Sequence, residues 1–122
     1  MTTTVLAVLV ACTSPAPICP SGGYDTLAVT VTDALSGLDV CGASVVASEG
    51  TSMYRLREIA GASDASCRYY FYIKGAGTQT YTVSVTAPGY KPGQASNVTV
   101  AFDGCGHVQN TQGVAIKLVP AP

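Results

Sequence analysis

The residues of this chain best suited to covalent chemistry are its five cysteines, and the first of them, Cys12, has a distinctive context. It closes an apolar run from Val5 to Ala11 and follows Leu9-Val10-Ala11, the pattern of a bacterial lipobox. At such a site a signal peptide is cleaved and the cysteine thiol is acylated. We therefore expect residues 1–11 to be a lipoprotein signal peptide and Cys12 to be the lipidation site.

The start of this leader is unusual, because Met1 to Thr4 carries no Lys or Arg ahead of the apolar segment. The alternative is that Val5 to Ala11 forms an edge strand of the folded domain. Thr13, rather than Asp, follows the cysteine, which favours the outer membrane of a Gram-negative bacterium. The composition from Thr13 to Pro17 is that of a linker, and we expect residues 12–24 to form a tether.

Four further cysteines, Cys19, Cys41, Cys67 and Cys105, form an even set once Cys12 is set aside. This many cysteines in 122 residues, behind a leader-like start, fit an oxidising compartment. We therefore expect disulfide bonds and an extracytoplasmic location, as an outer-membrane lipoprotein facing the periplasm or the cell surface.

The chain has few of the residues that a catalytic site or a metal site would need. A zinc peptidase or a non-haem iron enzyme needs several ligands, usually with two or more histidines, and the chain has one, His107. Asp103 and several serines are present for a Ser-His-Asp set, but no Gly-x-Ser-x-Gly motif accompanies them. We expect His107 to be a strand-end side chain near Cys105, and we expect no catalytic residue, metal ligand, cofactor or enzymatic activity.

The run Arg68-Tyr69-Tyr70-Phe71-Tyr72 is the feature most suited to binding, because aromatic rings stack on ligands and anchor protein interfaces. Alternation along a strand sends Tyr69, Phe71 and Ile73 to one face and Tyr70 and Tyr72 to the other. We expect the first set to be buried and the second to face outward. Outward tyrosines are also ordinary strand formers, so this face is either a ligand surface or plain sheet.

Strands must position these residues, because apolar and polar residues alternate with a period of two from Leu27 onward. Glycine and proline turn signals separate six or seven such segments. Only Tyr54 to Ala60 has helical spacing, with Leu56, Ile59 and Ala60 on one side. The predicted inward residues of the strands are Leu27, Val29, Val31, Ala43, Val45, Ala47, Tyr81, Val83, Val85, Ala87, Val98, Val100, Phe102, Val114, Ile116 and Leu118.

Composition limits the class further. Charged residues make up 11% of the chain and the net charge is −1, which excludes a nucleic-acid-binding footprint. No apolar stretch approaches the ~18 residues of a transmembrane helix. We therefore expect a single all-β domain, an antiparallel β-sandwich of six or seven strands of the Ig-like kind.

Three segments of the chain carry a family resemblance. They are Asp33-(x)2-Ser36-Gly37-(x)2-Val40-(x)2-Ala43-(x)-Val45, then Tyr81 to Tyr90, then Val98-Thr99-Val100. Together they resemble the carboxypeptidase regulatory-like domain, a transthyretin-like seven-stranded sandwich. We assign residues 25–120 to this domain. Cys105-Gly106-His107-Val108 is similar to a segment of a bacterial lipoprotein subgroup.

The resemblance also implies a disulfide pairing, although four cysteines can pair in three ways. In sandwiches of this type the first and last strands commonly run side by side in the same direction. Cys19 precedes the first strand and Cys105 the last, so both lie at one pole. Cys41 opens the second strand at the opposite pole, which leaves Cys67 as its partner.

The function that the resemblance implies is that of an accessory module. We expect a non-enzymatic, lipid-anchored β-sandwich with a structural or adhesive role at the cell surface, and the membrane as one partner through the lipid. An alternative is a module that binds a carbohydrate or a peptide through Tyr70 and Tyr72, with a glycan or protein as partner. A further alternative is a subunit of a surface assembly, because sparse charge leaves little repulsion between copies. The oligomeric state stays open.

Overall fold

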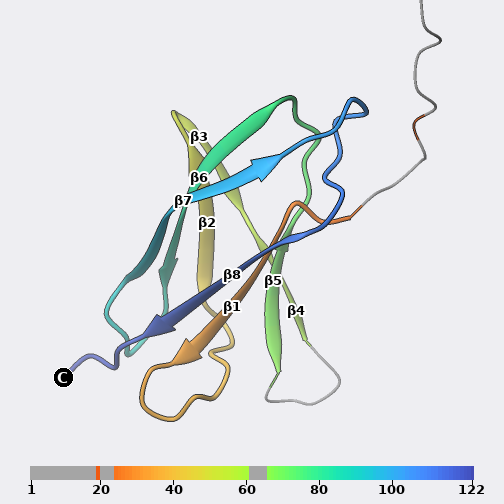
Figure 1. Ribbon diagram of the computed structural model, residues 1–122. Coiled ribbons are helices and arrows are strands. Elements are labelled where there is room, and N and C mark those ends of the chain that lie inside the picture. The colour runs from red at the N-terminus through yellow and green to blue at the C-terminus, as the bar shows by residue number, and fades with distance from the viewer. Residues whose placement is uncertain (1–18, 20–23, 61–65) are drawn as a thin grey trace, which may run out of the picture.

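The fold is seen in a computed structural model, which describes residues 19, 24–60 and 66–122 (Figure 1). These residues form eight strands, and none of them is helical. The strands are β1 (Leu27–Asp33), β2 (Ser44–Glu49), β3 (Ser52–Arg55), β4 (Arg57–Ala60), β5 (Cys67–Phe71), β6 (Thr78–Thr86), β7 (Gly93–Ala101) and β8 (Gln112–Leu118).

The strands form two sheets of four, a first sheet with the order β4-β5-β1-β8 and a second sheet with the order β3-β2-β6-β7. The sheets pack face to face, so the all-β sandwich predicted from the sequence is confirmed. β1 and β8 run parallel, and Figure 1 shows their arrows side by side. The remaining ladders are antiparallel, so the prediction of a wholly antiparallel sandwich is wrong, whereas the predicted parallel course of the first and last strands is confirmed.

The prediction of seven strands is also wrong, because the segment with helical spacing forms two strands. β3 pairs with β2 in the second sheet, and β4 pairs with β5 in the first. The chain crosses between the sheets at Leu56, which is buried, whereas Ile59 and Ala60 are exposed. A single inward side chain at this crossing, rather than an apolar helix face, explains the spacing.

The core lies between the two sheets and takes one face from each of the long strands. Leu27, Val29 and Val31 of β1 are fully buried, while Ala28, Thr30 and Thr32, which alternate with them, are partly exposed. The predicted inward residues are confirmed throughout, with Ala87 and Val114 packing against the core at its margin. Burying an aliphatic side chain of this size stabilises the fold by roughly 1.5–3 kcal/mol.

Aromatic rings occupy the middle of this core. Phe71 of β5 lies 4.9 Å from Tyr54 of β3 and 6.0 Å from Tyr81 of β6, measured between ring centroids. The Phe71 and Tyr81 rings meet edge to face, a favourable arrangement for aromatic pairs. Burial raises the pKa of Tyr81 to about 12, because an ionised phenol would lose its hydration there. The cluster therefore joins strands of both sheets.

A bulge in β7 keeps its apolar residues on the inner face. The register of β6 against β7 shifts between Tyr81 and Val83, and Asn97 has a φ of 58°. Asn tolerates this left-handed conformation better than most residues. As a result Ala95 packs at the core margin and Val98 is buried, although the two are three positions apart.

The N-terminal segment was predicted to contain the signal peptide and the lipidated cysteine. Residues 1–11, Cys12 and nearly all of the tether predicted over 12–24 lie outside the described residues. Within the described residues, no helix is long and apolar enough to span a membrane.

Candidate functional site

Two disulfides join the cysteines in the predicted pairing. Cys19 is bonded to Cys105, and Cys41 is bonded to Cys67. Cys67 opens β5, which is antiparallel to β1, whereas Cys105 precedes β8, which is parallel to β1. The disulfides therefore lie towards opposite ends of the sandwich, and disulfides of this kind fit a compartment outside the cytoplasm.

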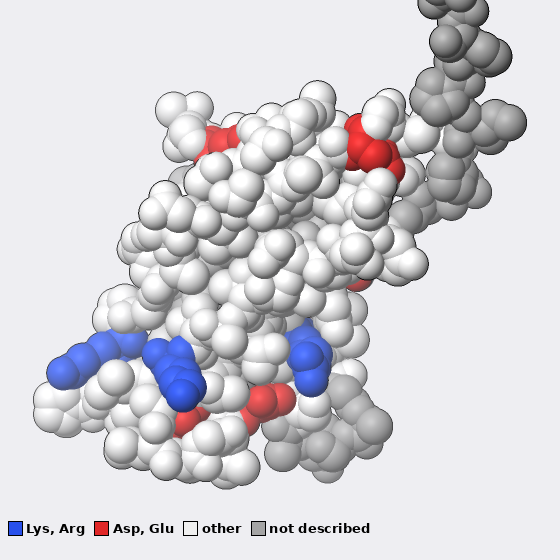
Figure 2. Space-filling view, in the orientation of Figure 1, with Lys and Arg blue, Asp and Glu red and all other residues white. Residues whose placement is uncertain are grey.

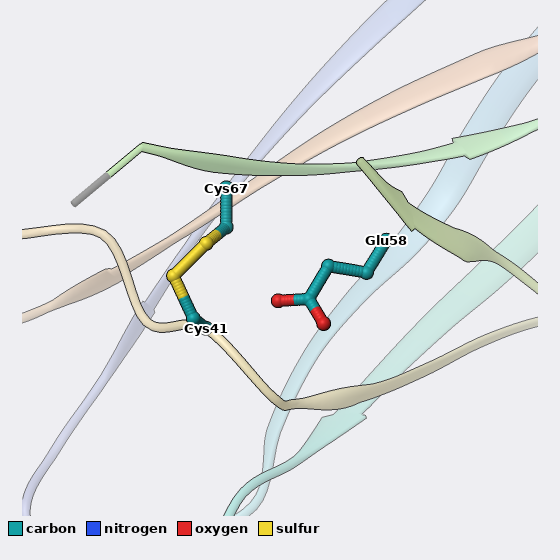
Figure 3. A group of neighbouring side chains, drawn as sticks. All are labelled: Cys41, Glu58 and Cys67. Carbon is teal, nitrogen blue, oxygen red and sulfur yellow. A yellow bond between two sulfur atoms is a disulfide. The ribbon is translucent and has the colours of Figure 1, made fainter. Parts of the chain in front are cut away.

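One disulfide has a carboxylate beside it, as Figure 3 shows. Ligand atoms of Cys41, Glu58 and Cys67 all lie within 4.8 Å of one another, a spacing that could hold a metal ion. The two sulfur atoms are bonded to each other, however, and thiolates are the form in which cysteine ligates a metal. In its oxidised form the cluster is therefore a structural staple.

The Glu58 carboxylate has a structural task of its own at this staple. Its Oε2 accepts a 2.7 Å hydrogen bond from the Gly42 backbone N–H and lies 3.3 Å from the Tyr69 hydroxyl. That hydroxyl donates to the Val40 carbonyl at 2.8 Å and accepts from the Ala43 N–H. Burial, before the nearby Glu58 charge, raises the pKa of Tyr69. These bonds fasten the loop before β2 against β4 and β5.

His107 lies at the other end of the sandwich and is buried in the loop between β7 and β8. Its Nε2 atom is 3.3 Å from the Tyr72 hydroxyl. The Asp103 carboxylate accepts from the backbone N–H groups of His107 and Cys105, which lowers the pKa of Asp103. Asp103 thus contacts the backbone of His107 and not its ring, and among the described residues the ring's polar partner is Tyr72.

The tyrosines of β5 are placed as the alternation predicted. Tyr69 and Phe71 are buried and Ile73 packs against the core margin, so the predicted inward face is confirmed. Tyr70 is half-buried on the outer face of the first sheet. Tyr72, just beyond the strand end, is 43% exposed and is oriented by its contact with His107.

On this outer face Tyr70 has an arginine on one side and small residues on the other. The register aligns it with Arg57 of β4 on one side and Ala28 of β1 on the other, and Ala28 is aligned with Gly113 of β8. A side-chain carbon placed on Gly113 would meet no atom within 4 Å. Across this face the side chains therefore become smaller, from Arg57 and Tyr70 to Ala28 and Gly113. Ala28 and Gly113 form an open floor beside the tyrosine.

The three arginines of the chain lie on three consecutive strands, and two of them, Arg57 and Arg68, share a face with this tyrosine. The third, Arg55, lies on the second sheet. Arg55 ends β3, Arg57 begins β4 and Arg68 lies on β5, two residues from Tyr70. Arg68 is aligned with Ile59 of β4, on the same face as Tyr70. Among the described residues none of the three guanidinium groups forms an ion pair or a hydrogen bond, and all three side chains are exposed.

An open depression of about 560 Å³ adjoins this group where the chain crosses between the sheets. Its lining includes Arg55, Arg57 and Glu58 together with the backbone around Gly42. Glu58 adds one negative charge, so the two guanidinium groups leave the depression positively charged. Figure 2 shows one face of the molecule, on which Lys and Arg lie over the lower half of the view together with some Asp and Glu.

We call Arg55, Arg57, Arg68 and Tyr70 the arginine edge. The sequence interpretation named Tyr70 in a run that begins with Arg68, but it missed Arg55 and Arg57, although all three arginines fall between positions 55 and 68. Their clustering in the sequence was visible, whereas the spacing allowed a helix where β3 and β4 carry two of them. No protein-family model matches the chain, and no curated protein matches it significantly.

Proposed function

We propose that this chain is a non-enzymatic β-sandwich module that works outside the cytoplasm, with a structural or adhesive role at the cell surface. It is held at the outer membrane of a Gram-negative bacterium by acyl chains on Cys12. The observation that carries the proposal is the pair of disulfides towards opposite ends of the sandwich. Such staples suit a small domain that must persist in an oxidising compartment.

The family proposal rests on architecture and motif residues together. The parallel course of β1 and β8 agrees with the order expected of a carboxypeptidase regulatory-like sandwich. Its motif residues also have structural tasks, since Asp33 accepts from the N–H groups of Leu35 and Ser36, and Gly37 has a φ of 77° in the same turn. Tyr90 packs against the core and donates to Asp33 at 2.8 Å. These contacts support our proposal that residues 25–120 belong to the carboxypeptidase regulatory-like family.

The lipid anchor is tested on protein isolated from its native membrane. Mass spectrometry should find Cys12 as the N-terminal residue with its thiol acylated. Each buried CH2 group contributes roughly 0.8 kcal/mol, so two or three acyl chains hold a soluble domain firmly. A Cys12→Ala variant should leave the membrane fraction. An intact Met1 on the native protein would overturn the anchor, and a domain inaccessible to added protease on whole cells would overturn display at the surface.

A second function, binding of a ligand through the tyrosine face, is favoured by the exposure of Tyr72 and the open floor beside Tyr70. Binding would be screened on glycan and peptide arrays. A Tyr70→Ala, Tyr72→Ala double variant should lose the binding, whereas Tyr24→Ala, which removes a tyrosine that is 61% exposed and outside this face, should retain it. Equal binding by the three proteins would contradict a ligand at Tyr70 and Tyr72.

A further inference from the structure

The arginine edge carries more positive charge than a plain sheet surface needs. Charged residues on edge strands commonly serve to prevent edge-to-edge pairing, and that task accounts for Arg55 on β3 and Arg57 on β4. Arg68 lies on β5, which is paired on both sides, by β4 and by β1. Edge protection therefore leaves Arg68 unexplained, and it leaves unexplained why Arg68 shares a face with Tyr70.

The three guanidinium groups are available to a ligand. They are exposed and make no ion pair within the described part of the chain, while Glu58, the carboxylate that lines the depression with Arg55 and Arg57, accepts from Gly42 and lies beside Tyr69. An arginine side chain presents a planar fork of donors that matches carboxylate or sulfate oxygens in pairs. The site therefore selects for negative charge spread over more than one group.

The tyrosine and the sheet geometry narrow the class of ligand. An extended peptide gains most of its affinity from main-chain hydrogen bonds to a free strand edge. Arg68 and Tyr70 lie on an interior strand, so a ligand that contacts them lies across the side chains of the sheet and not along the free backbone edges of β3 and β4. The face of a tyrosine beside a flat floor of Ala28 and Gly113 suits a ring that can lie against it.

We propose that the arginine edge binds an acidic polysaccharide, with the guanidinium groups of Arg55, Arg57 and Arg68 pairing with its carboxylate or sulfate groups and Tyr70 stacking on a sugar ring. The inference names the ligand class for the adhesive module proposed above, and in that sense it rests on that function. Arg57, Arg68 and Tyr70 lie on the outer face of the first sheet, and Arg55 adjoins them through the depression at Leu56, which Arg55 and Arg57 both line.

The test uses the folded chain from residue 12 onward on four immobilised polymers: polygalacturonate, dextran sulfate, unmodified dextran and polyglutamate. Binding is expected to one or both acidic polysaccharides, to weaken steeply between about 50 mM and 500 mM salt, and to be much weaker on the other two polymers. Equal binding to polyglutamate would overturn the sugar specificity. Equal binding to unmodified dextran would overturn the role of charge, and binding to none of the four would overturn the inference.

The chain offers a matched control, since it has three arginines and three lysines. Arg55→Gln, Arg57→Gln, Arg68→Gln should weaken binding by about ten-fold or more, whereas Lys74→Gln, Lys91→Gln, Lys117→Gln removes the same charge with less than about a three-fold effect. Arg68→Lys should give an intermediate loss, because it keeps the charge and removes the fork. Equal losses in the two triple variants would overturn the site.

The ring is tested separately, with folding monitored by thermal unfolding of every variant. Tyr70→Ala should weaken binding several-fold, and Tyr70→Phe should retain it, because stacking needs the ring and not the hydroxyl. No loss in Tyr70→Ala would contradict the stacking role. The surface role is measured independently, by the mass of the Cys12 N-terminus and by protease access on whole cells, so a failure on the polymers removes this inference and leaves the proposed function standing.

Discussion

The two sheets share one interior but differ on their outer faces. On the second sheet, the outward residues of β2, β6 and β7 are mostly Ser, Thr and Gln, as in Thr80, Thr82 and Ser84 of β6. On the first sheet, the outer face holds Arg57, Arg68, Tyr70 and Lys117 beside a floor of Ala and Gly. On these three strands of the second sheet neutral β-forming residues are enough to face water, although the neighbouring β3 ends with the exposed Arg55.

This difference suggests a division between residues that the fold requires, which lie in the core, and residues that it only tolerates, which lie on the outer faces. Changes inside the sandwich should reduce stability whichever sheet supplies the residue, since both sheets bury the same core. Changes on the outer face of the first sheet should affect binding with little effect on stability. The predictions below test this division, beginning with the links that join the sheets.

Removing a disulfide should cause the largest loss. In the chain-entropy model, replacing Cys19 and Cys105 by Ala costs about 4.5 kcal/mol of unfolding free energy, and replacing Cys41 and Cys67 costs about 3.5 kcal/mol. The difference follows from sequence separations of 86 and 26 residues. Denaturant unfolding of the two double variants would measure it. If the Cys41, Cys67 variant lost more, the contacts of Glu58 and Tyr69 at that staple would outweigh loop length.

The inner and outer faces of a single strand provide the next test. Phe71→Ala should lower the unfolding free energy by about 3–5 kcal/mol, because it empties the centre of the aromatic cluster. Tyr70→Ala, at the neighbouring position on the outer face, should cost about 1 kcal/mol or less. Denaturant unfolding of both variants is the measurement, and similar losses would mean that the division between the faces does not hold.

Much of this interior was predictable from the sequence. The period-two pattern of Leu27, Val29 and Val31 identifies inward positions, because a strand places alternate residues on opposite faces. The segment from Ser52 to Ala60 was not predictable in the same way. Its strands have four residues each and share one buried crossing residue, Leu56, so no alternation accumulates.

The candidate site depended on that same segment. Tyr70 could be placed outward by alternation along β5, and its role as a ligand contact stays a prediction. Arg57 could not be brought next to Tyr70, because their proximity arises from the pairing of β4 with β5 across residues 61–66, and Arg55 joins them only through the crossing at Leu56. Strand pairing between non-adjacent residues is a tertiary property that local periodicity does not encode.

A smaller effect is expected at the bulge of the second sheet. Asn97→Ala should lower the unfolding free energy by about 1 kcal/mol, since a left-handed φ of 58° is costlier for Ala than for Asn. Asn97→Gly should be neutral or slightly stabilising, because glycine adopts this conformation without a steric penalty. Thermal unfolding of the two variants would distinguish them. A loss in the glycine variant as large as in the alanine variant would mean that the Asn97 side chain, and not its backbone, matters.

The smallest effect concerns the hydrogen bond that links the sheets where β1 ends. Bonds from the Ser36 N–H, the Tyr90 hydroxyl and the Leu35 N–H hold the pKa of Asp33 below its ordinary value of 3.8. A lowered folded-state pKa stabilises the protein above pH 3.8, and this stabilisation is lost as the pH falls through the folded-state pKa. The same bond raises the pKa of Tyr90 above 10.0, so its contribution is present below pH 10 and is lost as the pH rises through that raised pKa.

Asp33→Asn should therefore flatten the fall of stability at both ends of the pH range, with the unfolding free energy measured from about pH 2.5 to pH 11. The effect should be small, because both groups lie near water. Tyr90→Phe should remove the alkaline part and leave most of the acid part, since the Ser36 and Leu35 N–H groups still bond Asp33. Asp25→Asn is the control, because the Asp25 carboxylate bonds no other described residue. An unchanged pH profile in Asp33→Asn would mean that the bond between Asp33 and Tyr90 contributes nothing measurable to stability.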